Sequence, residues 1–145
     1  MKKQINLRQY IMKKNILFYT SFLTLLSIGS SLYYNFYVCM LFSIIVQITS
    51  INYWRNPVKG IRRNVDILAV SVACIYNLYN SFYYKYYNFT YYVYLGINSY
   101  FISIYFKKFN YIRLSELFHF FVHLLPNISA SLMHYHMYSQ INQFK

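Results

Sequence analysis

Residues 15–54 read NILFYTSFLTLLSIGSSLYYNFYVCMLFSIIVQITSINYW and contain no aspartate, glutamate, lysine or arginine. A helix needs about 20 mostly apolar residues to cross the hydrocarbon core of a bilayer, so this stretch is long enough for two crossings. Residues 67–84, 86–106 and 117–144 are uncharged in the same way, and each is long enough for one crossing. The sequence therefore predicts an all-α, multi-pass transmembrane helical bundle of about five spans.

The whole chain is 58% hydrophobic and only 11% charged. Five spans of about 20 residues each leave almost no residues for a soluble domain. The apolar runs are too long and too continuous for the strands of a membrane barrel. We expect a basic N-terminal segment over residues 1–15, a transmembrane domain over residues 16–133 and a short tail over residues 134–145. No internal repeat is evident. The predicted spans are residues 16–34, 36–53, 65–83, 89–106 and 114–133.

The positive charges lie between the apolar runs in a regular pattern. Twelve of the fourteen lysines and arginines fall in the N-terminal segment and in every second loop, and only Lys85 and Lys145 fall elsewhere. Cytosolic loops are enriched in basic residues, which predicts a cytosolic N-terminus and an exofacial or lumenal C-terminus. Because no soluble basic face is formed, nucleic acid is not an expected partner. Membrane lipids are expected partners, because basic loops are attracted to an anionic leaflet.

A second interpretation treats the first 30 residues as a cleaved signal peptide. They combine a basic start, an apolar core and small residues at Ser27, Gly29 and Ser30, which is the pattern of a secretory signal. Cleavage would leave four spans in the same orientation. The cysteines, Cys39 and Cys74, both lie within predicted spans, and neither has the neighbours of a disulfide or zinc motif.

Ionisable residues within spans are energetically costly, so their positions are informative. Glu116, His119 and His123 follow one another at i, i+3 and i+7, within a stripe about 60° wide on one helical face. Two histidines at i and i+4 can hold one metal ion. Ser50 and Asp66 lie at the same predicted depth on two other spans. We therefore expect a polar site with Ser50, Asp66 and Glu116 as catalytic groups and His119, His123 and Asp66 as metal ligands.

The same residues also allow plainer roles. Asp66 and Glu116 lie close enough to the headgroups to pair with loop arginines, and histidines within a bundle often bond a neighbouring helix. A third role is a path for protons or ions between the subunits of an oligomer. His134 and His136, near the other end of the last span, are predicted to be exposed at the membrane interface.

The chain order of four polar residues resembles that of a family of membrane hydrolases: Ser50, Asp66, His119 and His123. The family is that of the alkaline ceramidases and the progestin/adiponectin-type receptors. The resemblance implies zinc-dependent hydrolysis of a membrane lipid, with zinc held by three histidines in a seven-span fold. This chain has five predicted spans, and Tyr53 and Trp54 occupy the place of the first histidine. Zinc would then need Asp66 or Glu116 as its third ligand.

Three functions follow from these observations. The first is a structural, assembly or interaction role within a membrane, including self-association. The second is a zinc-dependent lipid hydrolase of the ceramidase-like type. The third is a proton- or ion-conducting oligomer.

Overall fold

A computed structural model describes residues 18–57 and 60–143 of the chain. The described residues form helices joined by short turns and contain no strand, which confirms the predicted all-α class. The predicted basic segment and the start of the first span lie outside the described residues. The helical elements are η1 (Ser21–Leu23), α2 (Thr24–Tyr33), α3 (Tyr37–Arg55), α4 (Ile61–Tyr83), α5 (Asn88–Lys108) and α6 (Ile112–Gln143).

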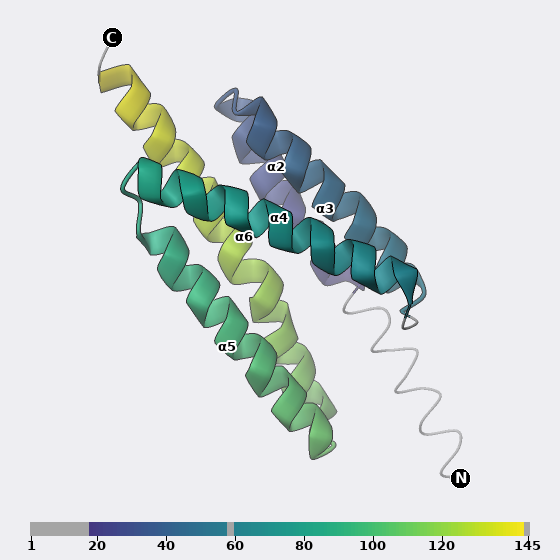
Figure 1. The fold of residues 1–145 in the computed structure, drawn as a ribbon. Coiled ribbons are helices and arrows are strands. Elements are labelled where there is room, and N and C mark those ends of the chain that lie inside the picture. Colours follow the sequence, from purple (N-terminus) through teal and green to yellow (C-terminus); the bar gives the residue numbers. More distant parts are fainter. Residues whose placement is uncertain (1–17, 58–59, 144–145) are drawn as a thin grey trace.

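The five α-helices run back and forth along one direction (Figure 1). The turns after α2 and α4 lie at one end of the bundle, and the turns after α3 and α5 lie at the other. The longest helix, α6, packs against both α2 and α5, whereas α3 packs between α2 and α4. Contact between α4 and α5 is slight, so α5 is held mainly by α6.

Three of the four turns close with the same backbone motif. Each has one residue in the left-handed region: Asn35 at φ 63°, Lys85 at φ 55° and Asn110 at φ 63°. The next residue then donates its N–H to the carbonyl five positions earlier, which is the Schellman arrangement that ends a helix. These bonds are Phe36 to Ser31 at 2.8 Å, Tyr86 to Ser81 at 2.8 Å and Tyr111 to Phe106 at 3.0 Å.

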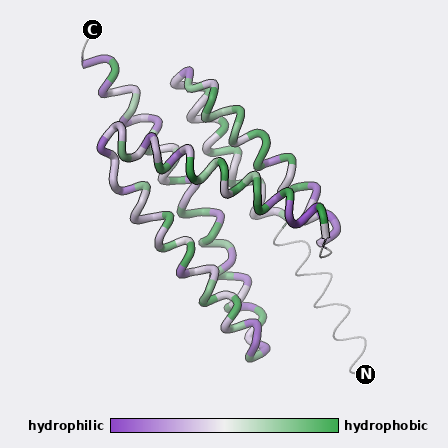
Figure 2. Tube along the Cα trace, in the orientation of Figure 1, coloured by the Kyte–Doolittle hydropathy of each residue, from purple (hydrophilic) through white to green (hydrophobic). Residues whose placement is uncertain are grey.

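The distribution of polar and apolar side chains is the reverse of that in a water-soluble domain. Among the described residues, 16 buried side chains are polar or charged and only 7 are hydrophobic, while 39 large hydrophobic side chains are exposed. Soluble proteins bury such residues. Figure 2 shows long hydrophobic segments along the outer helices, with hydrophilic residues gathered near the turns. Small polar residues, mostly serine, therefore make the contacts between helices.

Two helices, α3 and α4, are long and apolar enough by length and composition to cross a membrane. Only 22% of the apolar window of each is buried, so neither resembles the core helix of a soluble protein. The helices α5 and α6 are long enough, but their tyrosines, serines and asparagines lower their hydropathy. Two of the five helices therefore have both the length and the composition of a membrane span.

The last helix is longer than the sequence predicts. It continues to Gln143, through most of the residues expected to form the tail. Pro126 lies inside it and removes the hydrogen bond that the Val122 carbonyl would otherwise accept. A Cβ atom placed on Gly96 of α5 would lie 3.4 Å from Pro126 Cγ and 3.9 Å from the Val122 oxygen. The glycine thus allows α5 and α6 to approach closely at the proline.

The structure also reveals a repeat. Residues 31–37 read SLYYNFY and residues 81–87 read SFYYKYY, and the two segments form equivalent turns. The pattern of buried and exposed positions is identical over residues 31–40 and 81–90. The two turns are therefore alike and lie at the same end of the bundle. The hairpins that contain them differ, because α2 packs closely on α3 whereas α4 and α5 touch only slightly. The likeness is confined to the turns, and the expectation of no internal repeat beyond them stays a prediction.

Candidate functional site

Two of the predicted site residues meet across a helix interface. Ser50, near the end of α3, donates its hydroxyl to Asp66 Oδ1 at 2.6 Å, the short distance typical of a bond to a carboxylate. Thr49 contributes a second, longer bond to the same oxygen at 3.4 Å. Ser50 is 3% exposed and Asp66 is 8% exposed. Asp66 is thus held by hydroxyl donors from α3 rather than by the loop arginines close to it in the sequence.

The predicted histidine pair lies on α6, facing α3 and α5. The rings of His119 and His123 are 5.3 Å apart. His119 also packs edge-on against Trp54 of α3 at 5.3 Å and lies 6.3 Å from the ring of Tyr100 on α5. The Nε2 atom of His123 is buried and has no hydrogen-bond partner among the described residues.

The two parts of the predicted site each contact the end of α3. Ser50 bonds Asp66 of α4, and Trp54, four residues later, packs its ring against His119 of α6. Glu116 is half-buried and lies one turn before His119 on α6.

The described residues do not fit a three-ligand zinc site. No group of three histidine, cysteine, aspartate or glutamate side chains among them could hold a metal ion. A zinc site in a protein usually has at least three protein ligands, and the two histidines supply only two. Trp54 lies against His119, and its indole N–H is a donor that cannot bind a metal. Trp54 and Tyr100 thus pack against His119. Glu116, one turn earlier on α6, does not complete a three-ligand group with the two histidines among the described residues.

The other histidines of α6 form a second polar cluster. His134 is 1% exposed, so its predicted exposure was wrong. Its Nδ1 atom lies 2.8 Å from the Ser30 hydroxyl of α2, and its ring packs at 6.0 Å from Phe36 in the first repeated turn. The residue therefore ties α6 to the hairpin α2–α3.

His136 makes the corresponding contact with the other hairpin. Its Nε2 atom lies 3.0 Å from the carbonyl oxygen of Tyr84. Its ring packs at 5.2 Å from Tyr86, which occupies in the second turn the position of Phe36 in the first. Each repeated turn thus presents one aromatic residue to one histidine of α6. The sequence signal was the pair of turn motifs taken together with the two histidines two residues apart.

A polar seam joins α2 and α6 between the two histidine pairs. Ser27 donates its hydroxyl to Asn127 Oδ1 at 2.8 Å. Asn127 in turn donates to the backbone oxygen of His123 at 2.7 Å. A hydrogen-bonded route through α6 therefore links the seam to the buried histidine of the predicted site.

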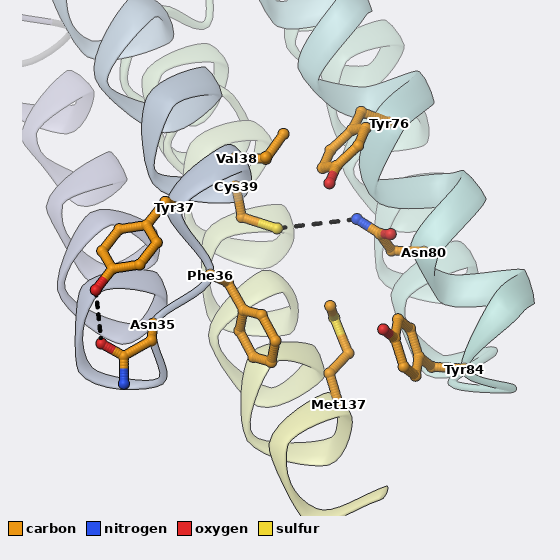
Figure 3. Close-up of a pocket in the computed structure, with 9 residues that line it drawn as sticks. All are labelled: Asn35, Phe36, Tyr37, Val38, Cys39, Tyr76, Asn80, Tyr84 and Met137. Carbon is orange, nitrogen blue, oxygen red and sulfur yellow. Dashed lines mark hydrogen bonds between the residues drawn. The ribbon is translucent and has the colours of Figure 1, made fainter. Parts of the chain in front are cut away.

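A cavity of about 280 Å³ opens between α3 and α4, near the repeated turns (Figure 3). It was not predicted, because its residues are individually ordinary and come from three helices. None of them carries a formal charge at neutral pH. The lining residues are Asn35, Phe36, Tyr37, Val38, Cys39, Tyr76, Asn80, Tyr84 and Met137.

Comparison of the chain with protein-family models, with curated proteins and with solved structures finds no match in any of the three. The function of the chain is therefore inferred from its own residues and their contacts.

Proposed function

We propose that this chain is an integral membrane protein that crosses the bilayer five times and serves a non-enzymatic assembly role, associating with further membrane helices and first with copies of itself. The observation that carries the proposal is the reversed distribution of side chains. Exposing a valine, leucine, isoleucine or phenylalanine side chain to water forgoes about 1.5–3 kcal/mol of burial, and 26 of the 39 exposed large hydrophobic side chains are of these types. In a bilayer the same surface is solvated by lipid, and small residues are favoured between helices.

Helix length supports spans at α3, α4 and α5. The helices α3, α4 and α5 contain 19, 23 and 21 residues, which corresponds to about 28 to 35 Å at 1.5 Å per residue. The hydrocarbon core is about 30 Å thick. The tight Schellman turns reverse the chain direction within a few residues. A helix that follows a span therefore runs back through the same bilayer. Tyrosine-rich ends, as on α5, suit the interface.

The ends of the bundle differ in charge, which supports a cytosolic N-terminus. Six of the seven described basic residues lie at or beside the turns after α3 and α5, and only Lys85 lies at the other end. This asymmetry follows the rule that lysine and arginine remain on the cytosolic side. The six residues are Arg55, Arg62, Arg63, Lys107, Lys108 and Arg113.

The buried polar contacts support a structural rather than a catalytic use of the interior. Ser103 of α5 donates to the backbone oxygen of Ser115 at 2.7 Å, and Ser50 and Ser27 make the interhelical bonds described above. Such bonds hold helices in fixed positions. The apolar outer faces of α4 and α5, which contact each other only slightly, are available to a second copy of the chain.

The topology is tested with single cysteines introduced at two turns of a chain carrying Cys39→Ser and Cys74→Ser. A membrane-impermeant maleimide should label Lys85→Cys in intact cells and Asn110→Cys only after permeabilisation. Labelling of both positions from the same side would overturn the five-span arrangement. Association is tested by counting photobleaching steps of the labelled chain in dilute vesicles, where a single step throughout would overturn self-association.

The zinc-dependent hydrolase is a second candidate, favoured by the short bond between Ser50 and Asp66. It requires the two histidines to gain a third ligand that the described arrangement does not supply. Elemental analysis of the purified chain distinguishes the candidates. One zinc per chain, lost in both His119→Ala and His123→Ala, would establish the hydrolase site, and its absence would exclude that site.

The conducting oligomer is a third candidate. It is favoured by buried polar atoms on α6 that have no hydrogen-bond partner among the described residues, on His123, Ser129 and His134. Such atoms are costly in a dry interior, and a file of water would satisfy them. A proton current in vesicles that changes in Glu116→Gln would support conduction, and the absence of any current would exclude it.

A further inference from the structure

The cavity lies between the hairpins α2–α3 and α4–α5, beside their two similar turns. On one side of the bundle, α6 fills the space between the hairpins with Ala130, Met133 and Met137, which pack against Phe89 and Val93. On the other side α3 and α4 meet directly, and the cavity between them is open, with Met137 of α6 in its lining (Figure 3).

The walls of the cavity are electron-rich but carry no formal charge. Four aromatic residues line it: Phe36, Tyr37, Tyr76 and Tyr84. The hydroxyl of Tyr37 is bonded to Asn35, whereas Figure 3 shows the other three rings around the space between α3 and α4. Two sulfur atoms, from Cys39 and Met137, line it as well, and Figure 3 shows both side chains in the space between α3 and α4. No lysine or arginine is among the lining residues, so an anion would have no cationic partner there.

We propose that this cavity binds a quaternary ammonium group of the choline type. Aromatic rings attract such cations through their quadrupoles, and a polarisable thioether suits their methyl groups. A primary ammonium would bring three N–H donors, which need acceptors when buried. A sugar would likewise need many hydrogen bonds, and the cavity offers two amides, those of Asn35 and Asn80, and three tyrosine hydroxyls. A quaternary ammonium group has no donors to satisfy.

The position of the cavity suits a lipid headgroup. Its α4 residues extend from Tyr84, at the end of the helix, to Tyr76, which is about 12 Å deeper at 1.5 Å per residue. This range extends from headgroup depth toward the upper acyl chains of the leaflet opposite the basic turns. The inference rests on the proposed membrane location but not on the number of spans or on self-association.

The test uses the full chain purified in a maltoside detergent. Equal amounts of phosphatidylcholine and phosphatidylethanolamine with the same acyl chains are added, and the retained lipid is measured by native mass spectrometry. The two lipids differ only in the substitution of the ammonium group. We expect a preference for the choline lipid of about tenfold, as two cation–π contacts would give. Equal retention of the two lipids would overturn the proposal.

Substitutions locate the preference in the cavity. Tyr84→Leu should reduce the preference about threefold because it removes one of the two cation–π contacts, whereas Tyr84→Phe should preserve it. The matched control is Tyr83→Leu, at an exposed neighbour that does not line the cavity. Val38→Trp fills the opening without removing a ring and should abolish retention. An unchanged preference in both Tyr84→Leu and Val38→Trp would overturn the proposal.

A final experiment distinguishes a lipid ligand from a free cation as the ligand. Tetramethylammonium chloride is added to the chain loaded with phosphatidylcholine. Release of the lipid would show that the cavity recognises the cationic group alone, so that free choline is also a ligand. Retention of the lipid, together with the preference over phosphatidylethanolamine, would show that a lipid is the ligand. Failure of the proposed topology would appear instead in the maleimide labelling of residues 85 and 110.

Discussion

The two histidine pairs of α6 differ in what they contact. His119 and His123 lie among aromatic rings. His134 and His136 bond the hairpins α2–α3 and α4–α5, and each packs against an aromatic residue of a repeated turn. In each pair one buried Nε2 atom, that of His123 or that of His134, has no partner among the described residues. The i, i+4 spacing of the first pair suggested a site, yet the second pair has the better-defined contacts. Spacing identifies a helical face but not what lies opposite it.

The largest loss of stability is expected when the His134 side chain is removed. His134→Ala removes a fully buried ring and its bond to Ser30, and should lower the free energy of unfolding by about 3 kcal/mol. His136→Ala is the matched control at a half-buried position and should cost about 1 kcal/mol. Both are measured by reversible denaturation in mixed micelles. Equal losses would show that burial does not distinguish the two residues.

The next largest effect concerns the other end of the bundle. Ser50→Ala leaves the Asp66 carboxyl with only its long bond to Thr49, and should destabilise the chain by about 1.5 kcal/mol. Ser71→Ala, at an exposed position of the neighbouring helix α4, is the control and should have no measurable effect. A neutral Ser50→Ala would show that the short bond to Asp66 contributes nothing to stability.

A smaller effect isolates the bond between α2 and α6. Ser30→Ala alone should cost about 1 kcal/mol. In the presence of His134→Ala its cost should nearly vanish, because the partner is already gone. The coupling energy from the double-mutant cycle is the quantity to measure. Strict additivity would mean that the 2.8 Å contact carries no interaction energy.

The smallest change in stability is expected at His123, and its sign should differ from that of the change at His134. His123→Leu removes a buried nitrogen that has no partner among the described residues, so it should be neutral or stabilise the chain by up to about 1 kcal/mol. His134→Leu, at the histidine that bonds Ser30, should instead be destabilising. A marked loss of stability in His123→Leu would show that the imidazole has a partner, such as water.

Much of the helical pattern could be read from the sequence, because uncharged runs and alternating basic loops are local signals. The predicted spans overlap all five helices, and Ser50 and Asp66 do meet. The burial of His134 could not be predicted from the sequence, because it depends on Ser30 of α2 lying opposite it. The continuation of α6 beyond residue 133 was missed because polar residues there look like a tail when their helical partners are unknown.

The repeated turns and the cavity could be found only in the structure, for a different reason. A helix interface built from serine and alanine leaves little pattern in the sequence, because the same residues occur in ordinary spans. Ser31 and Ser81 became recognisable as equivalent only through their identical turns and burial. The cavity likewise depends on α3, α4 and Met137 of α6 coming together, which no single segment specifies.

The pairing of Gly96 with Pro126 divides α6 mechanically. Proline leaves the Val122 carbonyl without its helical donor, so bending is easiest at that point. Phe89 and Val93 of α5 pack against the half after the proline, and the same half is bonded to α2 and to the turn that precedes α5. A bend at Pro126 would therefore change the distance between His119 and Trp54 while the contacts of His134 and His136 stay in place.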